Sequence, residues 1–291
     1  MLVRIGTRDS RLAMVQAEMV KQSIKAYDNS IDVRLVPMKT TGDIILDKTL
    51  DKIGGKGLFV KELDRALLEG EVDITVHSGK DMPMDLAPGL HIAAASVRED
   101  PRDALILPEG ISVWDKSKPV GCSSARRRVQ LKALYPDIQV LPVRGNVQTR
   151  LGKLDSGEFS ALILAAAGLK RLNMEARISR LFDTDDMLPS ACQGILAVEA
   201  RQGYDASFLS HFGDCDSMNC LRGERAFVRA LDGGCSKPCA AFAAIDKKGV
   251  MTLKGMYVSD DETIVRYGEI SCTPAGCEEP AERLAERLKY E

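Results

Sequence analysis

The side chains best suited to chemistry lie close together in the stretch HSGKDMP, His77 to Pro83. It follows the run VDITV, which is typical of a buried strand, and it contains an imidazole, a hydroxyl, an ammonium and a carboxylate. Ligands of open α/β sheets bind at the carboxyl ends of strands, where this stretch would lie. A carboxylate among cations stays ionised, so Asp81 could stabilise a developing positive charge or take a proton. The alternative is that Asp81 only forms a turn beside Pro83.

Arginines recur in the loops that follow the expected strands. Guanidinium groups bind carboxylates and phosphates through paired hydrogen bonds, and Ser123 and Ser124 before a helix would add backbone N–H donors at its positive end. Arg128 alone is better interpreted as part of a solvated helix face. The other arginines together favour a polyanionic ligand, and the residues leave open whether it carries carboxylates or phosphates. These arginines are Arg8, Arg126, Arg127, Arg144, Arg150 and Arg171.

A glycine-rich stretch, GGKGLF from Gly54 to Phe59, superficially suggests a phosphate-binding loop. It lacks the G-x4-G-K-[ST] spacing that places backbone amides and a lysine around phosphates. We interpret it instead as a cationic lid that carries Lys52 and Lys56.

Cys235 follows two glycines and precedes Pro238, which indicates a tight, exposed loop. An exposed thiol can be a nucleophile or an attachment point, whereas most cysteines are small buried hydrophobes. The residues alone leave both interpretations open. The eight cysteines do not repeat the C-x2-C spacing of structural zinc sites, so we expect no metal. No secretory signal is apparent, and reduced thiols are expected.

Strands and helices must position these groups, and short apolar runs alternate with helical patterns over the first two thirds of the chain. LVRIG and IDVRLVPM are typical of strands, and Asp9 or Ser10 can cap the helix between them. A second helix should end at Gly70. The alternation predicts parallel sheets covered by helices. The inward residues expected on the two helices are Ala13, Ala17, Val20, Ile24 and Tyr27 on the first, and Phe59, Leu63, Ala66 and Leu67 on the second.

Length and composition indicate a soluble globular protein of more than one domain. The 291 residues are 45% hydrophobic and 28% charged, with a net charge of -2, so nothing attracts the whole molecule to nucleic acid or to a membrane. We expect a cytoplasmic monomer. The patterns predict a first α/β domain at 1–97 with 195–215, a second at 98–194, and a small α+β domain at 216–291.

Nine motifs together resemble the porphobilinogen deaminase (hydroxymethylbilane synthase) family in type and order. They are RIGTRDSRLA, GGKGLFVKELD, VHSGKDMP, REDPRDA, SSARRRVQL, VRGNVQTRL, ILAAAGLKRL, ACQG and GGCSKP. The resemblance implies two domains like periplasmic type II binding proteins and a third that bears the cysteine. It also implies head-to-tail condensation of four porphobilinogen molecules with release of ammonia, in haem and tetrapyrrole biosynthesis. The family carries a dipyrromethane cofactor on a cysteine thioether, which would be Cys235.

The resemblance also implies a role for individual residues. Asp81 would assist loss of the substrate amine and stabilise the cation so formed. The catalytic residues would be Asp81, Lys80, Arg8, Arg144 and Arg150. The cofactor would contact Asp43, Ser10, Lys80, Ser123, Ser124, Arg126, Arg127, Arg144 and Gly145. The substrate would contact Arg8, Ser10, Arg144, Arg150, Arg171 and Gln193, under a lid with Lys52, Lys56 and Phe59.

The sequence departs from the usual family pattern at a few positions. Gly79 replaces a common Leu or Met, which could loosen the catalytic loop, and Cys239 adds a thiol near Cys235. Arg11 and Cys122 replace a usual Pro and Thr. Two rival functions are an anion-binding protein without catalysis, which would not need Asp81, and a cysteine-dependent hydrolase, which would need a base near its thiol.

Overall fold

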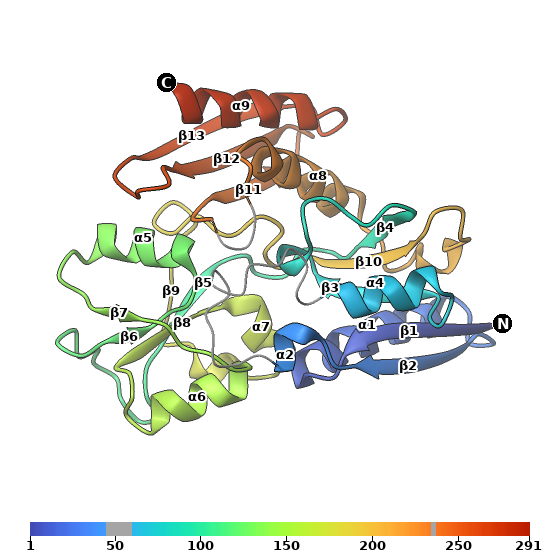
Figure 1. The fold of residues 1–291 in the computed structure, drawn as a ribbon, viewed down its shortest axis with the longest axis horizontal. Coiled ribbons are helices and arrows are strands. Elements are labelled where there is room, and N and C mark those ends of the chain that lie inside the picture. Colours follow the sequence, from blue (N-terminus) through green and yellow to red (C-terminus); the bar gives the residue numbers. More distant parts are fainter. Residues whose placement is uncertain (45–59, 234–236) are drawn as a thin grey trace.

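The computed structural model describes residues 1–44, 60–233 and 237–291, with only the backbone at 43 and 44. Figure 1 shows two α/β domains side by side and a third domain lying across both of them. The described strands form three separate sheets. No helix within these three segments is long and apolar enough to cross a membrane.

The first sheet contains the N-terminal strands and one strand that returns later in the chain. Its order is β2-β1-β3-β10-β4. Its core is made of valine and isoleucine side chains of the strands, packed against the apolar face of α1. The elements are β1 (Leu2–Arg8), α1 (Arg11–Tyr27), β2 (Asp32–Met38), α2 (Thr41–Ile44), α4 (Lys61–Leu68), β3 (Ile74–Ser78), the 3₁₀ turn η1 (Gly79–Asp81), β4 (Leu90–Ala95), β10 (Leu196–Arg201) and η3 (Ser207–Leu209).

The second sheet is also covered by helices. It is formed by the part of the chain between the two crossovers, the segments in which the chain passes from one α/β domain to the other. Its order is β7-β6-β8-β5-β9. Apolar residues of β5 and β8 fill the core on both faces of this sheet. The elements are β5 (Asp103–Ile106), β6 (Val120–Gly121), α5 (Ala125–Leu134), β7 (Val140–Leu141), α6 (Val147–Asp155), β8 (Ala161–Ala165), α7 (Ala166–Arg171), η2 (Glu175–Arg177) and β9 (Arg180–Leu181).

The prediction of parallel sheets is correct for part of each sheet, because both sheets are mixed. β10 pairs antiparallel with β3 and β4, and β5 pairs antiparallel with β8 and β9. β10 and β5 each begin directly after a crossover between the domains. A strand that starts at the crossover must run away from it, whereas β1, β3 and β8 run towards it. The direction is thus set by where the chain enters each domain.

The third domain is an antiparallel sheet, β11-β12-β13, covered by two helices. β12 largely alternates buried and partly buried residues, and β13 alternates exposed and partly buried residues, because only one face of the sheet meets the helices. Glu224 of α8 is completely buried and accepts hydrogen bonds from Arg98 (2.6 Å), from the Ala243 amide (2.7 Å) and from the Cys192 amide. One carboxylate therefore ties both crossovers to this domain. The elements are α8 (Cys215–Ala230), β11 (Ala240–Ile245), β12 (Met251–Val258), β13 (Val265–Cys272) and α9 (Glu278–Tyr290).

Helix predictions from periodicity are confirmed, apart from their ends. Ser10 caps α1 through a hydrogen bond from the Ala13 amide to its hydroxyl, and Gly70 takes a positive φ of 73° just after α4. Tyr27 was expected to face the core but is exposed, because it lies in the last turn of α1, where its ring meets the edge of His211.

Candidate active site

A cleft of about 580 Å³ lies where the loops of the two α/β domains meet. Its walls come from the carboxyl ends of β1, β3 and β8, from the turn before α6, and from the second crossover. Strands of both domains point their carboxyl ends at the cleft, which is where open α/β sheets bind ligands. The predicted residues that line it are Arg8, Ser10, Lys80, Asp81, Arg127, Arg144, Gly145, Arg150, Arg171 and Gln193.

Asp81 ends the short turn η1 and is exposed to the cleft. Among the described residues none donates a hydrogen bond to its carboxylate. The chain just beyond it is fixed, since Arg225 of α8 donates to the carbonyls of Pro83 (2.7 Å) and Met84 (2.8 Å). This arrangement holds an exposed carboxylate on a supported turn.

Lys80 is half-buried next to Asp81, and its ammonium donates to Gln193 Oε1 at 3.2 Å. Removal from water and the nearby charge of Arg127 lower the pKa of Lys80 to about 8. Gln193 itself is buried, and its amide donates to Asp103 Oδ1 at 2.8 Å. Gln193 therefore links the turn Gly79–Asp81 of the first domain to the buried Asp103 that holds the arginines of the second.

Arg150 and Arg171 present partly desolvated cationic groups to the cleft. Arg150 donates through Nε to the Gly145 carbonyl at 2.8 Å, and Arg171 donates through Nη2 to the Gly194 carbonyl at 2.6 Å. Burial lowers the pKa of each guanidinium to about 10. The Nε of Arg171 is buried with no hydrogen-bond partner in the described part of the chain. Desolvated cations of this kind gain most from an anionic ligand.

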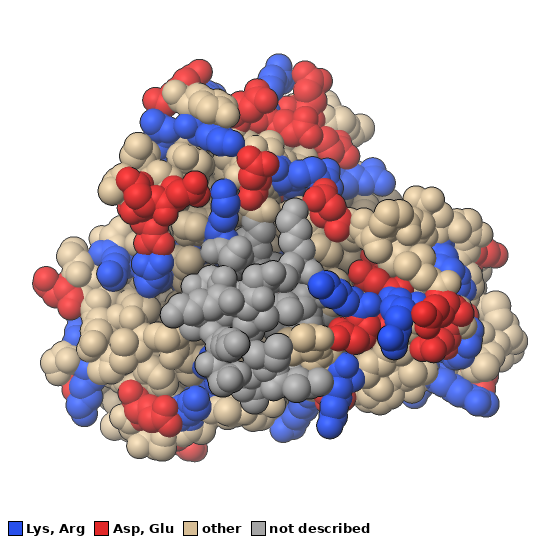
Figure 2. All heavy atoms as spheres, viewed as in Figure 1, with Lys and Arg blue, Asp and Glu red and all other residues tan. Residues whose placement is uncertain are grey.

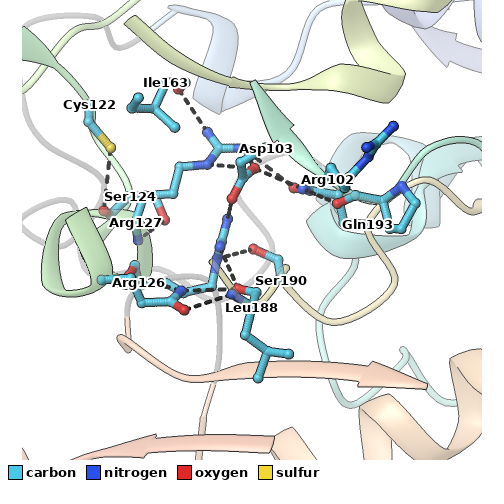
Figure 3. A network of polar contacts seen from close by, with 12 residues as sticks. Arg102, Asp103, Cys122, Ser124, Arg126, Arg127, Ile163, Leu188, Ser190 and Gln193 are labelled. Atoms are coloured by element: carbon cyan, nitrogen blue, oxygen red, sulfur yellow. Dashed lines mark hydrogen bonds and ion pairs between the residues drawn. The ribbon is translucent and has the colours of Figure 1, made fainter. Parts of the chain in front are cut away.

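Arg126 and Arg127 are held by a buried carboxylate, as Figure 3 shows. Asp103 is completely buried, and its two oxygens pair with Arg127 Nη2 at 2.7 Å and Arg126 Nη2 at 2.8 Å. Arg126 also donates to Ser190 Oγ (3.0 Å) and to the Leu188 carbonyl (2.7 Å). Arg127 still lines the cleft, whereas Arg126 does not. Most donors of Arg126 are thus engaged by the protein itself.

A second, smaller hollow of about 50 Å³ brings together Lys80, Ser124 and Arg126. It is also lined by Lys237 and Cys239, which follow Cys235 in the chain. Ser124 caps α5 by accepting a hydrogen bond from the Arg127 amide. This hollow extends the cationic region of the cleft towards the third domain.

Two residues are placed differently from the prediction. Ser123 lines neither the cleft nor the small hollow, because its hydroxyl bonds to the backbone of Val143. Arg128 was interpreted as a solvated residue, but it is half-buried and forms an ion pair with Glu262 of the third domain. Sequence position on α5 cannot reveal a partner more than a hundred residues away.

Sequence reasoning missed Gln16, which lines the cleft and donates to Ser78 Oγ at 3.0 Å. It is buried on the same face of α1 as Ala13 and Ala17. A polar residue next to an apolar stripe was the available signal.

Comparisons with known proteins identify the family. The family model for the porphobilinogen deaminase dipyromethane cofactor binding domain matches residues 3–208, and the model for the porphobilinogen deaminase C-terminal domain matches residues 218–290. The chain belongs to the porphobilinogen deaminase family.

Relatives of this family match over nearly the whole chain. The porphobilinogen deaminase of Acetivibrio thermocellus is 57% identical over 91% of each chain, and that of Alkaliphilus oremlandii is 54% identical over 100% of this chain and 98% of its own. Among solved structures, the VFT2 domain of Bordetella pertussis BvgS aligns with 72% of this chain and 84% of its own at 16% identity, with a TM-score of 0.41. The domain models and the observed α/β and α+β sheets confirm the predicted fold class.

The described lining fits the dipyrromethane cofactor of the porphobilinogen deaminase family. Its acetate and propionate groups are carboxylates, and the buried Nε of Arg171 lacks a hydrogen-bond partner within residues 1–44, 60–233 and 237–291. Figure 2 shows acidic and basic side chains interspersed over the face in view. Cys235, Lys52, Lys56 and Phe59 lie outside the described residues, as does the side chain of Asp43.

Proposed function

We propose that this protein is a hydroxymethylbilane synthase, which condenses four porphobilinogen molecules head to tail and releases ammonia at each step. One observation carries the proposal: an exposed aspartate, Asp81, faces a cleft lined by Arg8, Lys80 and further cations. An anion-binding protein would use the cations but not Asp81, and the described residues around Cys239 offer no histidine as the base of a hydrolase.

The cations would bind the carboxylates of substrate and growing chain. Arg150 and Arg171 are partly desolvated, and the Nε of Arg171 has no acceptor among the described residues, so carboxylates would form charge-assisted hydrogen bonds with these groups. Arg8, Arg144 and Ser10 line the same walls and would fix the orientation of the pyrrole. Binding by several cations also explains selectivity for a polyanionic substrate.

Asp81 would supply the chemistry that the cations cannot. Loss of the substrate amine leaves a cation, which an ionised carboxylate stabilises, and the same carboxylate can accept the proton released when the new bond forms. Lys80, with its pKa lowered to about 8, would deliver a proton to the departing amine or hold a carboxylate. When bound, the dipyrromethane supplies the terminal pyrrole carbon at which the chain grows. We propose Cys235 as its point of attachment.

The decisive experiment compares Asp81→Ala with a matched control. Incubation with porphobilinogen, followed by absorbance of the oxidised tetrapyrrole, should show turnover reduced by at least roughly 100-fold, because transition-state charge stabilisation is lost. Asp81→Glu keeps the charge and should lose less. Asp85→Ala removes an exposed carboxylate that pairs with Arg229 at 3.3 Å outside the cleft, and should keep normal turnover. Near wild-type rates for Asp81→Ala would remove this residue from the mechanism.

The proposal includes a cytoplasmic, monomeric enzyme with the three domains bounded as the sequence predicts. Size-exclusion chromatography with light scattering tests the monomer, and limited proteolysis tests the boundaries near residues 97, 194 and 216.

A further inference from the structure

The turn from Cys192 to Ile195 contacts the catalytic loop directly. The Gly79 amide donates to the Ile195 carbonyl at 2.9 Å, and Gln193 accepts from Lys80 at 3.2 Å. The first contact lies at the beginning of the turn Gly79–Asp81, and the second lies at its centre. The position of Asp81 therefore depends on how this second turn is placed.

Gly79 is a glycine for a steric reason. Its φ does not lie in the left-handed region, so the backbone there would accept alanine. A Cβ at this position would lie 3.0 Å from Cys192 Cβ and 3.2 Å from the Ile195 carbonyl oxygen. Those distances are shorter than ordinary van der Waals contact, so Cys192 fills the space that a side chain at position 79 would need.

Cys192 is held rigidly in an unusual conformation. Its φ is 63°, which non-glycine residues adopt rarely, and its side chain is completely buried. The Cys192 amide donates a hydrogen bond to Glu224 of α8, and Cys192 Sγ lies 3.8 Å from the Leu221 carbonyl of the same helix. The third domain thus fixes Cys192, and Cys192 in turn is packed against Gly79.

We propose that Cys192 is a positioning residue for Asp81, and that its Cβ, packed against Gly79, sets the place of the catalytic turn in the cleft. The contact joins the third domain to the first, through Glu224, Cys192 and Gly79. This positioning role of Cys192 deepens the proposed function and rests on the role given there to Asp81. If Cys192 served only core packing, it would be equally buried, but a side chain added at position 79 would not change turnover.

Substitutions at the two positions separate these explanations. Gly79→Ala should lower kcat by roughly tenfold or more while KM changes less than about threefold, because a small displacement of a catalytic group affects chemistry more than binding. The double variant Gly79→Ala with Cys192→Gly lacks the opposing Cβ. Its kcat should return to within about threefold of that of the single variant Cys192→Gly. Adding Cys192→Ala instead removes only the thiol, keeps the Cβ, and should restore nothing.

The controls distinguish this contact from general effects. Gly152→Ala makes the same change in α6, where no atom of the described residues lies within 4 Å of the new Cβ, and should leave kcat and Tm close to wild type. Tm should be non-additive for Gly79→Ala with Cys192→Gly and additive for Gly79→Ala with Gly152→Ala. Wild-type kcat in Gly79→Ala, or equal rescue by Cys192→Ala, would overturn the inference. An inactive wild-type enzyme would instead refute the proposed function.

Discussion

Asp103 and Arg127 form a buried ion pair, with Asp103 Oδ1 2.7 Å from Arg127 Nη2. Burial by itself would raise the pKa of Asp103, but the adjacent guanidinium groups of Arg126 and Arg127 hold it well below its usual value. The carboxylate is therefore ionised over the whole range in which the protein would work. It compensates two buried cations, of which Arg127 lines the cleft. This compensation has a consequence for stability.

Asp103→Ala should lower the free energy of unfolding by about 3–5 kcal/mol, because it leaves two buried guanidinium groups without their counter-charge. Urea denaturation measures this change. Asp155→Ala is the matched control, since Asp155 pairs with Arg177 at the same 2.7 Å distance but nearer the surface. It should cost about 1 kcal/mol or less. Equal losses of unfolding free energy in the two variants would show that the burial of Asp103 adds nothing to the stabilising effect of its ion pairs.

Asp64 should make stability fall with rising pH. Burial, and then the nearby charge of Glu199, raise the pKa of Asp64 to about 7, while His77 opposes this. Between about pH 4 and pH 7 the folded protein thus holds a proton that the unfolded chain has lost, so folding is favoured at the acidic end of that window. The urea midpoint should decline from pH 4 to pH 7 more steeply in the wild type than in Asp64→Asn. Parallel pH profiles would contradict the assignment.

Arg150→Leu should impair substrate binding or assembly of the cofactor. A carboxylate would lose charge-assisted hydrogen bonds worth about 1.5–3 kcal/mol, which corresponds to roughly a 10- to 100-fold loss in kcat/KM. Arg222→Leu is the control, because Arg222 is exposed on α8 and does not line the cleft. A similar loss for Arg222→Leu would indicate a general effect of removing positive charge.

Intact-mass measurement should show an adduct of two linked pyrroles on Cys235, and it should survive reductant because a thioether does not exchange with thiols. Cys235→Ser should lose both the adduct and activity. Cys239→Ser should keep both, since Cys239 is half-buried at the start of β11, where a small side chain serves packing. Pyrroles on Cys239 in a peptide map, or release by reductant, would refute the assignment.

The sequence by itself determined the features that depend on local pattern. Strand β3 and the position of Asp81 just after it follow from an apolar run and a polar loop. A cap at Asp9 or Ser10, and the place of Ser124 before a helix, also follow from neighbouring residues, and the structure selects Ser10 as the cap. Such features require only neighbouring residues, so they can be read along the chain. The ordered motifs also identified the family, and the comparisons confirm it.

Tertiary structure alone decided which of these residues meet. The partner of Arg127 in the ion pair is Asp103, and Gly79, which the sequence suggested could loosen the catalytic loop, is instead packed against Cys192. The directions of β5 and β10 likewise depend on where two crossovers enter their sheets. Contacts between residues far apart in sequence depend on how whole domains pack. Burial and steric exclusion act between atoms that are close in space, and the local sequence around a residue does not specify which distant residues come close to it.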